Sequence, residues 1–318
     1  MPSEQESAGA AVGVGAVGIR PGEADGILAE MPEGDKFCLV AFSDEGLAGS
    51  YPDHRPVRYC RDYNVLLQDP AVELVLVDGP VEKRRDFAVR ALNAGRHAVL
   101  APPFCEAALD AERVMKTAVR KGLVATMDLP WRADPDLRAV QAALEGENVA
   151  AVQGLFSFFC VEEAAGAHPG DGLLERVGMV MLDQMHLLLR ADVKSVSAHL
   201  QRPAPGAPED GFLLYLPLRS GGWAVGQASA QAGMGLPRWT LYTARAAFSA
   251  SGGQAVVGTA DGARTYAAPE AGEGFWENVY SAVRHGADMK CHPADIVRAM
   301  KLHEASLLSA ELGEPVVI

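Results

Sequence analysis

Three glycines near the start of the chain have the spacing of a phosphate-binding turn. They lie in the run Gly13–Gly18, whose sequence is Gly-Val-Gly-Ala-Val-Gly, directly after the short apolar segment 10–12. Glycines at this spacing allow a tight turn between a strand and a helix, and they let the backbone approach a pyrophosphate closely. The predicted dinucleotide site comprises Gly13, Gly15, Ala16, Val17 and Gly18. A purely structural glycine turn is the alternative interpretation.

A carboxylate follows the second apolar run of the chain. The segment Phe37–Phe42 has the composition of a strand, and Ser43 and Asp44 come directly after it. An acidic residue at the tip of this strand accepts hydrogen bonds from the ribose hydroxyls of NAD and repels the 2′-phosphate of NADP. Asp44 therefore favours NAD over NADP as the cofactor.

The composition excludes several classes of partner. The chain has 318 residues, of which 49% are hydrophobic and 22% charged, which suits about two globular domains. A net charge of −13 argues against nucleic acid or an anionic membrane as the main partner. The five cysteines are scattered without a CxxC pair, which predicts reduced thiols in a cytoplasmic protein. We expect neither a signal peptide nor a membrane span, since no basic, apolar leader and no run of about 18 apolar residues occurs.

The elements that must position these residues fall into two patterns. From residue 10 to 127, short apolar strands alternate with helices, which is typical of a parallel sheet covered on both faces. After Trp131, a long helix at 173–189 precedes several strand-like runs separated by glycine turns, as in hairpins. We therefore predict an α/β fold with a Rossmann-type doubly wound parallel sheet and a second, α+β domain with a large, mostly antiparallel sheet. The predicted limits are a disordered tail at 1–8 and domains at 9–130 and 131–318.

The order of these motifs resembles the Gfo/Idh/MocA family of oxidoreductases. The matching segments are the glycine run, Asp44, the segments 69–77 and 91–100, and the closing segment 304–317. The resemblance implies a first domain that binds NAD or NADP. It also implies a second domain whose open sheet face forms subunit contacts, giving a homodimer or a homotetramer. The implied reaction is hydride transfer at a carbinol carbon of a sugar, polyol or related hydroxy compound.

Two positions depart from the family pattern near the expected active site. The family has Glu-Lys-Pro after the fourth strand, where the lysine stabilises the developing alkoxide, whereas this chain has Ala101-Pro102-Pro103. After the third strand the family has Thr-Pro and, a little later, a histidine. Here Pro80 keeps the proline and is expected to belong to the cofactor site. Arg84 stands where the histidine would be, and we interpret it as a solvent-exposed helix residue.

The resemblance also indicates an acid–base pair on the helix predicted at 173–189. In the family an Asp and a His, commonly four residues apart, act on the substrate hydroxyl. Here Asp183 and His186 are three apart, which still places them on one side of a helix. Histidine titrates near neutrality, so His186 is the expected proton acceptor or donor and Asp183 the residue that orients it. Because His186 lies among leucines and methionines, a hydrogen-bonded core histidine is the alternative.

The resemblance implies that Trp131 and Arg132 bind substrate, because they follow the last strand of the first domain, where the family often has an asparagine or arginine near the cleft. Arg132 can bind a carboxylate or phosphate through two parallel hydrogen bonds. It can equally pair with Asp134 or Asp136 at the start of the next helix. Arg238, beside the second sheet, can line the substrate face but is more typical of a surface residue.

The prediction is an NAD-dependent oxidoreductase that acts on a small molecule and binds neither nucleic acid nor membrane. We predict no metal site, because the histidines and cysteines lack the spacing of zinc ligands. The alternative is a catalytically eroded or repurposed relative that binds dinucleotide without net redox turnover. Its basis is the loss of the family lysine at Pro102.

Overall fold

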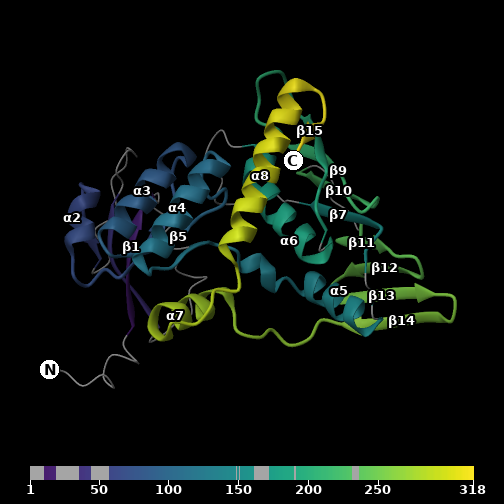
Figure 1. The fold of residues 1–318 in the computed structure, drawn as a ribbon, viewed down its shortest axis with the longest axis horizontal. Helices are drawn as coiled ribbons and strands as arrows, with labels where there is room; N and C mark the ends of the chain where they lie inside the picture. Colours follow the sequence, from purple (N-terminus) through teal and green to yellow (C-terminus); the bar gives the residue numbers. More distant parts are fainter. Residues whose placement is uncertain are drawn as a thin grey trace. The chain divides into compact units, whose positions relative to one another are not determined.

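The chain forms two compact units, each with its own sheet (Figure 1). The structure is a computed structural model that describes residues 11–18, 36–43, 57–147, 149, 151–160, 172–189, 191–230 and 236–318. The first unit comprises Met1–Asp128 and Glu273–Val297, and the second comprises Leu129–Gly272 and Arg298–Ile318. Among the helices in these described ranges, none is both long and apolar enough to cross a membrane.

A parallel six-stranded sheet forms the centre of the first unit. Its strands are β1 (Val12–Val17), β2 (Phe37–Ser43), β3 (Arg58–Tyr59), β4 (Leu74–Val77), β5 (His97–Leu100) and β6 (Ala125–Met127). They lie in the order β3-β2-β1-β4-β5-β6, so the chain builds outward from β1 and then crosses to β4 on the other side. The predicted Rossmann-type doubly wound sheet is confirmed, and its direction changes between β1 and β4.

Helices that pack on this sheet are α2 (Tyr63–Gln68), α3 (Val81–Asn93), α4 (Ala108–Lys121) and α7 (Phe275–His285). The local sequence explains their form. In α4, Ala111, Val114, Met115 and Ala118 recur at helical spacing and are buried. The helix ends at Gly122, whose φ of +66° suits the left-handed position that closes a helix.

The first strand differs from its prediction. β1 covers Val12–Val17, so Gly13 and Gly15 lie inside a buried strand and not in a turn after it. A Cβ on Gly13 would overlap the carbonyl oxygen of Ala71, and a Cβ on Gly15 would collide with a leucine side chain of α2. Close packing therefore requires glycine at both positions. Of the three motif glycines, Gly18 alone lies at the end of the strand, with a φ of +79°.

Helix α7 packs in the first unit, whereas the prediction assigned everything after residue 130 to the second domain. Phe37 of β2 makes edge-on contacts with Trp276 and Tyr280, with ring centroids 5.6 and 5.9 Å apart. Arg284, in the last turn of α7, donates two hydrogen bonds to the carboxylate of Glu73, at 2.5 and 2.7 Å. These contacts join residues more than 200 positions apart, so local periodicity does not reveal them.

A nine-stranded sheet forms the second unit. Its strands are β7 (Gly154–Cys160), β8 (Ser195–Gln201), β9 (Gly211–Pro217), β10 (Trp223–Ser229), β11 (Trp239–Tyr242), β12 (Ala246–Ser251), β13 (Gln254–Thr259), β14 (Gly262–Ala267) and β15 (Val316–Val317). They lie in the order β14-β13-β12-β11-β7-β10-β9-β8-β15. Within the described part of this sheet, β7 and β10 pair in parallel and the other neighbours pair antiparallel, so the predicted mostly antiparallel sheet is confirmed.

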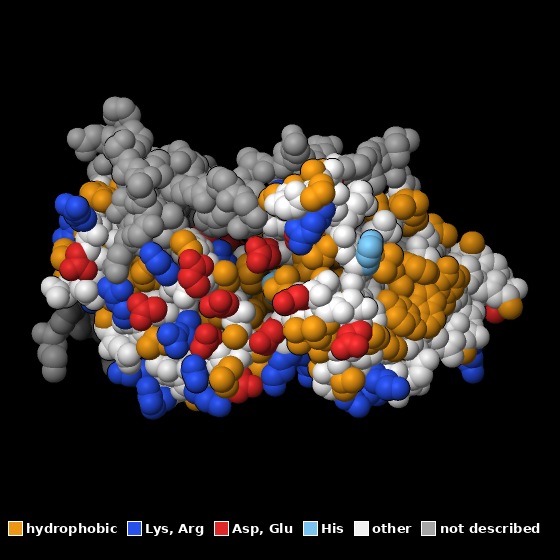
Figure 2. Space-filling model, turned by 90° about the horizontal axis from the view of Figure 1, so that it is seen from above, with side chains coloured by type: hydrophobic (Ala, Val, Ile, Leu, Met, Phe, Trp, Pro, Cys, Tyr) orange, Lys and Arg blue, Asp and Glu red, His pale blue; other side chains and the backbone are white. Residues whose placement is uncertain are grey.

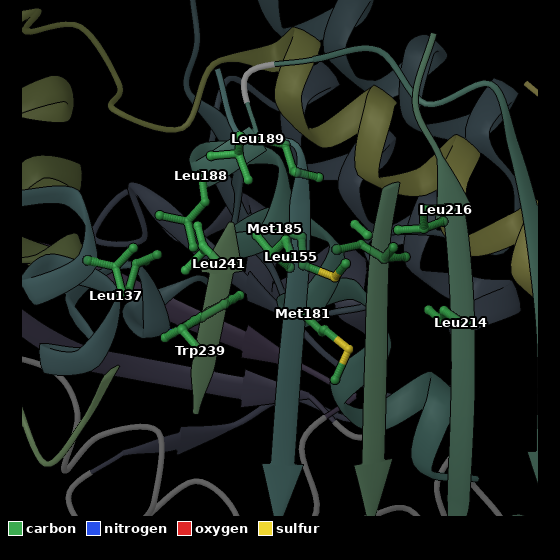
Figure 3. Close-up of a cluster of buried hydrophobic side chains, with 14 of the residues drawn as sticks. Leu137, Leu155, Met181, Met185, Leu188, Leu189, Leu214, Leu216, Trp239 and Leu241 are labelled. Atoms are coloured by element: carbon green, nitrogen blue, oxygen red, sulfur yellow. The ribbon is translucent and has the colours of Figure 1, made fainter. Parts of the chain in front are cut away.

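The helical elements of this unit are the 3-10 turn η1 (Pro130–Ala133), α5 (Pro135–Gly146), the π-helical turn η2 (Leu174–Gly178), α6 (Met179–Leu189) and α8 (Pro293–Leu312), of which the part from Arg298 on belongs here. One face of the sheet packs against a hydrophobic cluster that includes Leu155, Met181 and Met185 (Figure 3). Side chains alternate along β9: Leu214 is buried, whereas Tyr215 is 43% exposed. The described side chains of the other face, which we call the open face, are partly exposed, and Figure 2 shows hydrophobic side chains gathered on this unit.

Candidate functional site

The carboxyl ends of β1 and β4 meet through two glycines. Gly18 follows β1 and Gly79 follows β4, with φ values of +79° and +87°. A Cβ on Gly79 would lie 3.0 Å from the Cα of Gly18, and a Cβ on Gly18 would overlap the carbonyl oxygen of Asp78. The amide of Gly18 donates to the carbonyl of Ser43 at 3.0 Å, and the amide of Asp78 donates to the carbonyl of Val17 at 2.9 Å. This edge, which we call the glycine edge (Gly18 and Gly79), lies where the doubly wound sheet changes direction, the usual ligand site of such sheets.

The glycine edge offers one polar group that fits a bound ligand, the hydroxyl of Ser43. Gly18 and Gly79 themselves pack against the opposite strand end, since a Cβ on either would overlap its backbone. The hydroxyl of Ser43, at the end of β2, is buried and has no hydrogen-bond partner in the described part of the chain. A buried hydroxyl without a partner is costly, so a ligand or water atom at this position would stabilise the protein. Asp44 and the helix expected after β1 lie outside the described residues.

Arg84 is buried beside the glycine edge, which corrects its interpretation as a solvated helix residue. Its side chain is 4% exposed. Nε donates to the carbonyl of Gly79 at 2.9 Å, and Nη1 donates to the carbonyls of Ala101 and Pro103 at 3.1 and 2.5 Å. Nη2 donates to Oδ1 of Asp78 at 3.1 Å. A guanidinium has five N–H donors in a fixed plane, so Arg84 joins the loop after β4 to the loop after β5.

The run Ala101-Pro102-Pro103 lies directly after β5. Pro102, which stands in place of the family lysine, has neither a proton to donate nor a charge. The positive charge that the structure places beside this run is that of Arg84, whose donors hold backbone carbonyls.

Arg132, in the second unit, pairs with Asp183 of α6. Nε and Nη2 of Arg132 donate to the two carboxylate oxygens at 2.8 and 2.5 Å, and Asp183 is 2% exposed. The two alternative partners that we predicted for Arg132 on the next helix accept other hydrogen bonds. Asp134 accepts a hydrogen bond from a backbone amide in the first turn of α5, and Asp136 accepts one from the turn between β12 and β13. The prediction for Arg132 was a bidentate bond to a carboxylate or phosphate of the substrate, and in the structure the carboxylate of Asp183 has this geometry.

Gln184, the next residue of α6, links two further parts of the unit. Its Nε2 donates to the carbonyl of Trp131 at 2.6 Å, and its Oε1 accepts from Nη2 of Arg238 at 2.6 Å. Arg238 also donates to Oγ of Ser157 at 2.8 Å and lies over the ring of Phe159. Burial lowers the pKa of Arg238 to about 9. Arg238 therefore joins the interior hydrogen-bond network of the unit, which sequence reasoning missed because a lone arginine beside a strand is usually solvated.

His186 has a different partner from Asp183. It is half-buried, and its Nε2 lies 2.6 Å from Nη1 of Arg298 in α8. Arginine has only donors, so Nε2 is the acceptor and carries no proton. Asp183, the residue expected to orient His186, accepts hydrogen bonds from Arg132 at both of its carboxylate oxygens. Within the described ranges, no group of three or more His, Cys, Asp or Glu is arranged to hold a metal ion.

The architecture of the whole chain matches proteins of known structure. It superposes on an NAD-binding protein from Listeria innocua with a TM-score of 0.81 and 20% identity, over 97% of this chain and 100% of that one. The chain has the fold of that protein. An oxidoreductase from Agrobacterium radiobacter, in complex with NAD+, L-tartaric acid and magnesium, gives a TM-score of 0.80 and 18% identity, over 96% of this chain and 98% of that one.

Similarity in sequence is confined to part of the chain. The uncharacterized oxidoreductase YhhX of Escherichia coli strain K12 is 28% identical over 138 residues. The match covers 42% of this chain and 40% of that protein, so it spans less than half the length of either. No family model matches the chain.

Proposed function

We propose that the chain is an NAD-binding oxidoreductase of the Gfo/Idh/MocA type. The observation that carries the proposal is the glycine edge, Gly18 and Gly79, at the crossing point of a doubly wound sheet. The NAD named in two structurally similar proteins and the oxidoreductase relative support it. We propose NAD over NADP because Asp44 follows β2, where a carboxylate repels a 2′-phosphate.

Bound NAD would supply the hydride chemistry, and the chain would supply binding and proton transfer. Gly18, Ser43, Gly79 and Pro80 would hold the cofactor at the end of the first sheet. We propose a sugar, polyol or related hydroxy compound as the substrate, with Trp131 and Arg132 among its binding residues.

Proton transfer is proposed for His186, with a condition that the structure sets. Nε2 of His186 accepts a hydrogen bond from Arg298, so it takes up a proton only after that bond is released. Asp183 would act through Arg132, whose guanidinium it holds in place.

A second candidate function is dinucleotide binding without net redox turnover. Two observations favour it: Pro102 offers no proton donor, and Asp183 and His186 are each bonded to an arginine. A general acid or base typically contributes a factor of about 10² to 10⁴ in rate. Without such groups, a protein of this fold would retain the cofactor but little turnover.

The two candidates are separated by calorimetry with NAD+ and NADP+, followed by an NADH absorbance screen against polyols, sugars and sugar acids. The oxidoreductase binds NAD+ and forms NADH on at least one substrate. It loses this activity in His186→Ala but keeps it in His199→Ala, a matched change at an exposed histidine of β8. NAD+ binding without turnover on any substrate supports the second candidate. Absence of NAD+ binding refutes both.

We also propose a homodimer or homotetramer formed through the open face of the nine-stranded sheet. Five large apolar side chains on its strands are between 41% and 46% exposed: Phe156, Leu213, Tyr215, Tyr242 and Val256. Contiguous exposed apolar side chains of this kind are typical of protein interfaces. Light scattering after size-exclusion chromatography measures the assembly, and a monomer at micromolar concentration would contradict this part of the proposal.

A further inference from the structure

Arg238 is a half-buried arginine whose hydrogen-bond partners all lack a charge. It directly precedes β11, and its guanidinium lies over the ring of Phe159, 3.1 Å from the centroid. Nη1 donates to Oγ of Ser157 at 2.8 Å and to the carbonyl of Phe158 at 3.4 Å, and Nη2 donates to Oε1 of Gln184 at 2.6 Å. A buried charge is normally paired with an opposite one. In the ranges that the structure describes, Arg238 has no ion pair.

Arg132 differs from Arg238 in having a carboxylate partner. Asp183 accepts from Nε and Nη2 of Arg132 at 2.8 and 2.5 Å, so this pair has no net charge. The next residue of α6, Gln184, is the partner of Arg238 and is neutral. Its Nε2 donates to the carbonyl of Trp131, which joins Arg238 to the segment that we propose binds substrate. Of the two arginines, Arg238 is therefore the one whose charge is not met by a hydrogen-bonded carboxylate of the described chain.

Two carboxylates act on Arg238 from beyond hydrogen-bond range. Within the described chain, the charges that raise its pKa belong to Asp134 and Asp136. Their hydrogen bonds are to other groups, since Asp134 accepts from the amide of Leu137 and Asp136 from the amide of Gly253. Both lie at the start of α5, where the positive end of the helix offsets part of their charge. Burial has the larger effect and lowers the pKa of Arg238 to about 9, so the guanidinium keeps its charge at pH 7.

The guanidinium of Arg238 has donors beyond those used inside the protein. A guanidinium has five N–H groups in one plane, and the three hydrogen bonds of Arg238 come from Nη1 and Nη2. Nε makes none within the described residues. Two donors therefore remain on a side chain that is partly open to solvent, which is the number that a carboxylate accepts from one arginine.

We propose that Arg238 binds the carboxylate of a hydroxy-acid substrate, so that the substrate is an acid and not a neutral sugar or polyol. This inference rests on the proposed function, because it names the class of its substrate. A single guanidinium with Asp134 and Asp136 nearby suits an anion of one charge. It disfavours a phosphate ester, which carries close to two charges at pH 7.

Calorimetry on the full chain tests the substrate class with three matched pairs: glycerate and glycerol, threonate and threitol, gluconate and glucitol. The members of a pair differ in a carboxylate against a CH₂OH group. A charge-assisted hydrogen bond makes at least one acid bind at least about tenfold more tightly than its alcohol. Equal binding within every pair overturns the proposal, since the charge of Arg238 is then already met by the protein, and so does the absence of acid binding at millimolar concentration.

Each titration is made without dinucleotide and again with saturating NAD+. A protein that does not bind NAD+ refutes the proposed function. The comparison of acid with alcohol in the absence of dinucleotide still decides the role of Arg238 in that case, so the two failures are distinguishable.

Three variants test whether Arg238 is the binding group. Arg238→Gln is expected to weaken the acid at least about tenfold and to leave the alcohol unchanged. Gln184→Glu places a carboxylate beside Nη2 of Arg238, as Asp183 does for Arg132, and is expected to weaken the acid by a similar factor. Arg245→Gln removes the same charge from the exposed turn between β11 and β12 and is expected to bind like the unchanged protein.

Two outcomes of this series overturn the assignment. Acid binding by Arg238→Gln equal to that of Arg245→Gln removes the role of the guanidinium. An equal loss for acid and alcohol in Arg238→Gln shows a structural role and not recognition of the charge. Circular dichroism establishes that each variant is folded, and if Arg238→Gln is not, Gln184→Glu decides, because its acid binding should fall while its alcohol binding does not.

Discussion

Replacing Arg84 by methionine would test how the loops beside the glycine edge are held. Methionine keeps much of the apolar stem and removes every donor. The change deletes the bonds to the carbonyls of Gly79, Ala101 and Pro103 and the bond to the carboxylate of Asp78. We expect lower stability and weaker NAD+ binding together, because the same side chain fixes both loops.

The expected loss of stability follows from the burial of the ion pair between Arg84 and Asp78. The side chains of Arg84 and Asp78 are 4% and 16% exposed. Removing one partner of a buried ion pair costs about 3–5 kcal/mol, and each carbonyl left without a donor adds to this cost unless water reaches it. We therefore expect Arg84→Met to lower the free energy of unfolding by about 3–5 kcal/mol, a large part of the usual 5–15 kcal/mol. Arg84→Lys keeps the charge but lacks the planar guanidinium, so its free energy of unfolding should lie between those of the unchanged protein and Arg84→Met.

Urea unfolding followed by circular dichroism measures the loss, with Arg85→Met as the matched control. Arg85 is the next residue of α3, is 45% exposed and lies 3.7 Å from Asp110. An exposed pair of this kind contributes little, so Arg85→Met should change stability by less than about 1 kcal/mol. Because a chain of two units need not unfold in one step, hydrogen exchange of the loops after β4 and β5 localises the effect. If the two variants unfold within about 0.5 kcal/mol of each other, the assigned role of Arg84 is refuted.

Three further predictions concern the edge, the pH response and the assembly. Gly79→Ala should lower the free energy of unfolding by at least about 1 kcal/mol more than Gly95→Ala does, and it should weaken NAD+ binding. Both glycines have a positive φ, but only Gly79 approaches a neighbouring backbone. Equal melting temperatures of the two variants would contradict this prediction. Burial lowers the pKa of His303 from 6.5 to about 4, so its contribution to stability is present above 6.5 and is lost as pH falls toward about 4. Between pH 7 and pH 4 this effect lowers the free energy of unfolding by about 3 kcal/mol, and His303→Gln should remove that part of the loss in urea unfolding at the two pH values. A variant whose stability falls with pH as steeply as that of the unchanged protein would contradict the prediction. Tyr215→Glu should dissociate the oligomer in light scattering, whereas Val119→Glu, at an exposed position of α4, should not.

The sequence predicted those elements whose local pattern agrees with their surroundings. Strands were predicted at 195–201 and 246–251 and a helix at 293–312, and β8, β12 and α8 have these limits. In β12 the buried residues alternate with more exposed ones, which is the pattern that predicts a strand. Strand β14 was missed, since nearly all of its side chains are exposed and no apolar alternation reveals it. The predicted helix at 173–189 begins as a π-helical turn, Leu174–Gly178, which no periodicity signals at this length.

The site residues were harder to predict, because their roles depend on contacts distant in sequence. Gly13 and Gly15 have the spacing of a phosphate turn, yet backbone and side chains of the next layer occupy the space beside them. Arg84 was read as solvated, as charged helix residues usually are, and its place just after Gly79 at the end of a strand was the signal that could have corrected this. The partner of Arg132 lies 51 residues away on α6, beyond the reach of a local pairing argument.

The central claim is that a dinucleotide binds at the glycine edge between β1 and β4. Hydrogen exchange of the full chain, with and without saturating NAD+, tests it most directly. We predict slower exchange in peptides covering residues 78–84 and 101–104, and unchanged exchange across β8 of the second unit. Saturation with NAD+ that leaves 78–84 and 101–104 unchanged would contradict it.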